Sequence, residues 1–152
     1  MKKLIYACLA LCLFTTIASA QKITQKDLQG NWTLLGFESG PIYFDLVKKD
    51  IIVPAELKGQ IPPDADAQMR AALPMLDGSY LEVKDNNLTM TLGPDGESGT
   101  FVLTEKDGKQ IMTITFEDKT SDESEIFMKD KQLHLVQYTD GVKEAEFVYA
   151  KK

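Results

Sequence analysis

The sequence holds few side chains of the kinds that carry catalysis. His134 is the only histidine in 152 residues, and it stands between Leu133 and Leu135. In a strand this alternation turns His134 away from the apolar face. A general base needs a nucleophile within reach, and the sequence offers no candidate for one. We therefore interpret His134 as a solvated or partly covered surface residue.

Acidic side chains are numerous, yet their spacing does not build a hydrolase or metal site. Two carboxylates could form a glycosidase pair, but most acidic residues fall in expected turns or on the polar face. Neither Asp64-Ala65-Asp66 nor Asp95-Gly96-Glu97 continues into the twelve-residue loop of oxygen ligands that binds calcium. We interpret the first as a helix start and the second as a hairpin turn. The sequence thus indicates no enzyme, no metal site and no cofactor.

The first twenty residues are typical of a signal peptide. Lys2 and Lys3 precede an apolar run over residues 4–17, and Ala18-Ser19-Ala20 has the small residues that a signal peptidase recognises. The run is about 14 residues long, shorter than the ~20 that a membrane-spanning helix needs. We therefore expect a protein without a membrane span, exported to the periplasm or secreted after cleavage following Ala20, with one domain over residues 21–152.

The expected mature chain is acidic and free of cysteine. Cys8 and Cys12 are the only cysteines, and both fall in the leader. Without Lys2 and Lys3, 15 basic residues face 23 acidic ones, a net charge of −8. Such a charge argues against nucleic acid as a partner. Disulfides and thiol chemistry are excluded as well, so the fold must rely on its core.

Most of the remaining chain alternates between apolar and polar residues, as half-buried strands do. Short turns separate the segments, which favours antiparallel neighbours over parallel ones. One domain with a single apolar sheet face has no second layer to cover it, so closure is expected. The sequence predicts an all-β fold, an eight-stranded antiparallel up-and-down barrel, with strands over residues 32–38, 80–84, 88–92, 100–105, 110–117, 125–129, 132–138 and 143–150.

A short helical insert is expected between the first two of these strands. Asp64 and Asp66 suit a helix N-terminus, alanines follow, and Pro74 ends the segment. Residues 42–53 follow neither a helical nor a strand period. An amphipathic helix in this position would lie over the open mouth of the barrel as a lid.

Gly30-Asn31-Trp32, at the head of the first strand, resembles the G-x-W motif of the lipocalins. Together with the leader and the eight-strand pattern, it makes the chain similar to bacterial lipocalin-like, calycin-type proteins. The resemblance implies that Trp32 packs across the closed end of the barrel. It also implies a basic residue from the last strand above Trp32, here Lys151 or Lys152, and an interior that holds a small apolar ligand.

The interior decides between two hypotheses about function. Methionine is a pliable lining for irregular apolar guests, and this favours a non-enzymatic barrel that binds a small hydrophobic molecule. The alternative is a filled barrel that acts as a protein-binding module, for example as an inhibitor of an exported enzyme. For the first hypothesis the expected lining is Leu81, Met90, Phe101, Leu103, Met112, Ile114 and Met128, covered by Met69 and Leu73.

Overall fold

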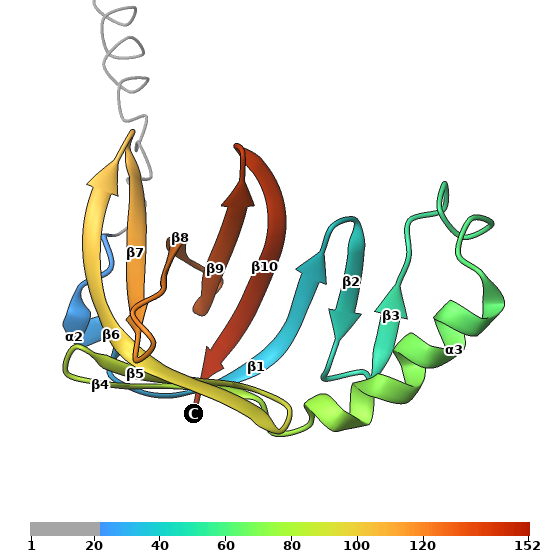
Figure 1. Cartoon of the computed structure of the whole chain (residues 1–152), viewed down its shortest axis with the longest axis horizontal. Coiled ribbons are helices and arrows are strands. Elements are labelled where there is room, and N and C mark those ends of the chain that lie inside the picture. The colour runs from blue at the N-terminus through green and yellow to red at the C-terminus, as the bar shows by residue number, and fades with distance from the viewer. Residues whose placement is uncertain (1–21) are drawn as a thin grey trace, which may run out of the picture.

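The computed structural model describes residues 22–152. The signal peptide expected over residues 1–20, its two cysteines and the cleavage site lie outside the described residues. One antiparallel sheet of ten strands dominates the fold, and pairing of its strands β10 and β1 closes eight of them into a barrel (Figure 1). The predicted all-β class and the eight-stranded barrel are confirmed. The barrel strands are β1 (Gly30–Ser39), β4 (Tyr80–Lys84), β5 (Asn87–Leu92), β6 (Asp95–Lys106), β7 (Lys109–Phe116), β8 (Ser121–Lys129), β9 (Gln132–Thr139) and β10 (Val142–Lys151).

The first strand changes partner along one of its edges. Over Gly30–Thr33 this edge of β1 pairs with β4, and over Gly36–Ser39 it pairs with β2 (Ile42–Asp45), while the other edge pairs with β10. A hairpin then joins β2 to β3 (Asp50–Ile52) and leads away from the barrel. Strands of four and three residues are too short to display a period, which explains why residues 42–53 fitted neither pattern.

The helical insert forms, but it does not cover the mouth. Helix α3 (Pro63–Ala72) and the 3-10 turn η1 (Leu73–Leu76) fall between the first two barrel strands, as predicted. The helix packs along β3, beside the barrel rather than over it (Figure 1). The expectation of a lid was therefore wrong, because the β2–β3 hairpin extends the sheet outward and carries α3 with it.

One end of the barrel, which we call the closed end, is sealed by Trp32 and helix α2 (Gln25–Leu28). Thr24 and Asp27 form a reciprocal capping box at the start of this helix. The buried Trp32 indole donates its Nε1 hydrogen to the Leu28 carbonyl oxygen over 2.7 Å. The Lys151 ammonium lies 5.1 Å from the indole centroid, in the position that the resemblance implied for a basic residue of the last strand.

The middle of the barrel is filled with side chains. Leu81, Met112 and Leu133 are fully buried and belong to one continuous core. Such a core is packed as densely as an organic crystal, so no channel runs through the molecule's centre. Several apolar side chains pack on this core and are only partly buried: Phe37, Leu46, Met90, Leu103, Phe116 and Phe147.

Candidate ligand-binding site at the open end of the barrel

A recess lies at the end of the barrel opposite Trp32, which we call the open end. Strand β5 ends here at Leu92, and β6 begins here at Asp95. The recess has a volume of about 270 Å³. Its walls combine apolar and aromatic groups with two carboxylates, and its lining consists of Met90, Thr91, Leu92, Asp95, Glu97, Phe147 and Tyr149.

The strand register explains why acidic side chains line an apolar recess. Glu97 pairs with Met90, and Met90 pairs with Leu81 of the core. Residues directly opposite each other in a sheet share a face, so Glu97 belongs to the interior wall of β6, as does Asp95 two residues before it. The sequence pattern predicted that this strand begins at Thr100 and that Asp95 belongs to a hairpin turn. That assignment was wrong, since β6 pairs with β5 from Asp95 onward.

Tyr149 brings a buried polar group to the same recess. Its side chain is only 1% exposed, and burial raises the pKa of its phenol. No hydrogen bond within residues 22–152 acts on its hydroxyl, and the hydroxyl oxygen is not among the fully buried atoms that lack a partner. Buried tyrosine hydroxyls usually have a hydrogen-bond partner, so this one is available to a molecule in the recess.

Aromatic rings continue the apolar wall from the recess toward the β2–β3 hairpin. Phe147 stacks on Phe37 with ring centroids 5.9 Å apart, and Phe37 stacks on Phe44 at 4.6 Å. These rings come from three neighbouring strands, β10, β1 and β2. The open end is therefore apolar and aromatic well beyond the recess.

The predicted ligand-binding residues do not form one site. Four of them, Leu81, Phe101, Met112 and Ile114, are buried in the filled core. Of the others, only Met90 lines the open-end recess.

The remaining four predicted residues lie elsewhere. Leu103 lines a shallow recess beside Ile23. Met128, which is 37% exposed, lies near Trp32 at the closed end. Met69 is in α3, and Leu73 is buried at the start of η1, so neither covers the barrel mouth. The alternation of the strands located the interior face but did not reveal which end of it remains open.

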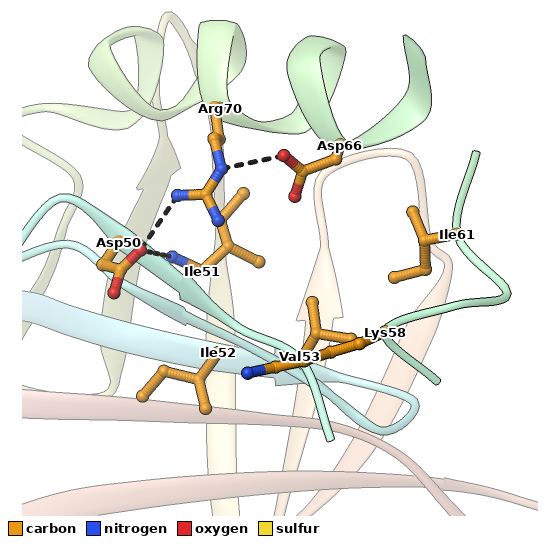
Figure 2. A pocket seen from close by; sticks show the side chains of 8 residues that line it. All are labelled: Asp50, Ile51, Ile52, Val53, Lys58, Ile61, Asp66 and Arg70. Carbon is orange, nitrogen blue, oxygen red and sulfur yellow. Dashed lines mark hydrogen bonds and ion pairs between the residues drawn. The ribbon is translucent and has the colours of Figure 1, made fainter. Parts of the chain in front are cut away.

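A second recess, of about 480 Å³, lies between β3 and α3 (Figure 2). Its wall is apolar at Ile51, Ile52, Val53 and Ile61, and Lys58 also lines it. Arg70 spans the other side. Its Nη1 donates to Asp50 over 2.9 Å, and its Nε donates to Asp66 over 3.0 Å. The hydrogen bond from Arg70 lowers the pKa of Asp50. The Arg70–Asp66 pair lies within α3, and the Arg70–Asp50 pair connects this helix, which has no buried residues, to the hairpin.

His134 lies on the outer wall of the barrel, as predicted, but it is not solvated. It is only 7% exposed and stacks on Phe127 with 4.8 Å between ring centroids. Its Nδ1 lies 2.6 Å from Glu146 Oε1, while its Nε2 has no partner among the described residues. Phe127 stacks on the His134 ring, and Lys143 donates to Glu146, so the pair belongs to a polar cluster on the outer wall.

Two further properties concern only the part of the chain that the structure describes. No group of three or more histidine, cysteine, aspartate or glutamate side chains in residues 22–152 is placed to hold a metal ion. No helix in this range is both long enough and apolar enough to span a membrane.

The fold defines the class of protein as a closed eight-stranded antiparallel β-barrel, compatible with a calycin-like fold. Comparison with known proteins found no matching family model, no matching curated protein and no matching solved structure.

Proposed function

We propose that this chain is an exported, non-enzymatic, lipocalin-like barrel that binds a small apolar molecule at its open end. The observation that carries the proposal is the recess above the filled core, where Met90, Leu92 and Phe147 remain accessible in an otherwise closed barrel. Small-molecule sites are typically concave and mostly apolar, with a few polar groups that orient the ligand. The position of Trp32 beneath Lys151 adds support for the lipocalin resemblance.

The size of the recess limits the affinity that apolar contact can provide. A guest that buries about 300 Å² of apolar surface gains roughly 7.5 kcal/mol at ~25 cal/mol per Å². Association costs at least ~4 kcal/mol in lost freedom. The remaining ~3.5 kcal/mol corresponds to a dissociation constant of the order of millimolar. Tighter binding requires a polar anchor.

Titration with octan-1-ol, followed by amide chemical shifts, tests the proposal. We expect octan-1-ol to shift amides over residues 90–97 and near Phe147, because these residues surround the recess. Met90→Trp fills the recess and should abolish the shifts.

Val102→Trp is the matched control, since Val102 lies on the outer face of β6 and is 60% exposed; it should leave the titration unchanged. A wild-type protein that shows no shifts up to the solubility limit of octan-1-ol would contradict the proposal. If Met90→Trp fails to fold, Leu92→Trp, at an exposed position of the same recess, replaces it.

The second candidate function is the protein-binding module, and the recess in Figure 2 favours it. Strand β3 ends the sheet order, so no strand within residues 22–152 pairs with its outer edge. Ile52 on this strand is 50% exposed beside Val53 and Ile61. An apolar segment of a partner protein could pack against these residues. Octan-1-ol shifts confined to residues 50–61 would favour this reading over the barrel mouth.

A further inference from the structure

We infer that the ligand of the open end carries a positive charge, as an apolar amine or ammonium compound does. This inference rests on the proposed function and specifies the chemistry of its ligand. It follows from the two carboxylates, the aromatic walls and the hydroxyl that together line the recess.

The carboxylates of the recess have no counter-ion among the residues that the structure describes. Asp95 and Glu97 form no ion pair with any lysine or arginine within residues 22–152. Both side chains are exposed, so their charges lie at the rim of the recess. A cationic headgroup whose apolar tail occupies the recess would meet them there.

The basic side chains of the neighbouring strand β10 are directed elsewhere. Lys143 donates to Glu38 over 2.9 Å and to Glu146 over 2.5 Å, on the outer wall. Lys151 lies over Trp32 at the closed end. None of the residues that line the recess is a lysine or an arginine. An anionic headgroup, such as the carboxylate of a fatty acid, would meet two like charges here, and the Tyr149 hydroxyl is the only donor side chain of the lining besides Thr91 that it could reach.

The aromatic groups and the phenol favour the same ligand. The faces of Phe147 and Tyr149 carry the negative side of a ring quadrupole, which attracts ammonium groups. The Tyr149 hydroxyl, on which no hydrogen bond within residues 22–152 acts, can accept a hydrogen bond from an N–H group and can also donate one. Asp95 and Glu97 therefore attract a cation at long range. Phe147 and Tyr149 can contact it directly once it lies in the recess.

Three eight-carbon probes of different charge test the inference by amide chemical-shift titration at pH 7. We expect octylammonium to bind at least about tenfold more tightly than octan-1-ol, the effect of a charge-assisted contact. Octanoate should bind more weakly than octan-1-ol. The preference for octylammonium should shrink as salt screens the carboxylates.

Substitution of the carboxylates separates charge from shape. The double variant Asp95→Asn with Glu97→Gln should bind octylammonium no more tightly than octan-1-ol, while its affinity for octan-1-ol stays unchanged. Glu82→Gln is the matched control, because Glu82 is an exposed carboxylate on the outer face of β4, and it should not alter the preference. Tyr149→Phe, which removes only the hydroxyl, should weaken octylammonium binding more than octan-1-ol binding.

The outcomes distinguish the inference from the function on which it rests. If octan-1-ol or octanoate binds the recess as tightly as octylammonium does, the positive charge of the ligand is refuted and the apolar site stands. If none of the three probes shifts amides around the recess, both proposals fail. If octylammonium binds the double variant as tightly as the wild type, the attraction comes from the acidic surface in general, and the inference is overturned.

Discussion

At the scale of single residues, the outer wall of the barrel carries a polar cluster, which consists of Glu38, His134, Lys143 and Glu146. Glu146 accepts hydrogen bonds from Lys143 and contacts His134, while Lys143 also reaches Glu38. Burial alone would raise the pKa of Glu146, but the hydrogen bonds from Lys143 and His134 outweigh it and hold the pKa below its usual value of 4.5. The cluster thus favours the ionised form of Glu146.

This shift links stability to pH. A carboxyl whose pKa is lower in the folded protein than in the unfolded chain contributes stability above the unfolded pKa. The contribution is lost as pH falls below about 4.5 and through the lower folded pKa. Glu146→Gln should therefore lower stability at pH 7 and flatten its decline in acid. Urea unfolding between about pH 7 and pH 3 measures both effects.

Glu82→Gln, at an exposed position on the outer face, should leave that decline nearly unaltered. Equal acid sensitivity of wild type and Glu146→Gln would contradict the prediction.

The sequence placed His134 on the outer face by alternation, yet it could not show its burial. That burial depends on cross-strand neighbours such as Phe127 and Glu146, which no local pattern encodes.

At the scale of elements, the change of partner along β1 depends on Gly36. The ladder between β1 and β10 shifts register between Leu34 and Gly36, as at a β-bulge. A Cβ atom on Gly36 would lie 2.5 Å from the Phe44 carbonyl oxygen and 2.5 Å from the Tyr43 hydroxyl. Only a residue without a side chain lets β2 approach β1 this closely.

Gly36→Ala should therefore loosen the β2–β3 hairpin. We expect a loss of roughly 1 to 3 kcal/mol, the cost of forcing extra volume into a packed site. Hydrogen exchange should accelerate mainly over residues 42–52, and urea unfolding gives the free energy. Gly59→Ala is the control, since open space surrounds Gly59. If hydrogen exchange over residues 42–52 is the same in Gly36→Ala as in the wild type, β2 does not need the close approach to residue 36, and the prediction is wrong.

The strands whose apolar and polar residues alternate over at least five positions could be predicted from the sequence. The shorter strands β2 and β3 could not. The strands 80–84 and 132–138 correspond closely to β4 and β9. The start of β6 was missed because Gly93, Pro94 and Gly96 are typical of a turn. This error concealed the candidate site, since Asp95 and Glu97 belong to the missed part of the strand.

At the scale of the whole molecule, the proposed leader leads to one prediction about processing. The small residues Ala18 and Ala20 predict a cut before Gln21. The protein recovered outside the cytoplasm should therefore have an intact mass that corresponds to residues 21–152, with or without cyclisation of its first glutamine. A recovered species that retains Lys2 and Lys3 would contradict export by this route.

Closure of the barrel also sets the order in which the chain can fold. The ladder between β1 and β10 joins Trp32 to Lys151, near opposite ends of the described chain. Contacts between such distant residues make folding slow, typically milliseconds to seconds for β-barrels. During synthesis at about 5 to 20 residues per second, β1 and β9 keep unpaired edges until β10 arrives. Strand β10 closes the barrel and thus removes the two free edges through which an open sheet can aggregate.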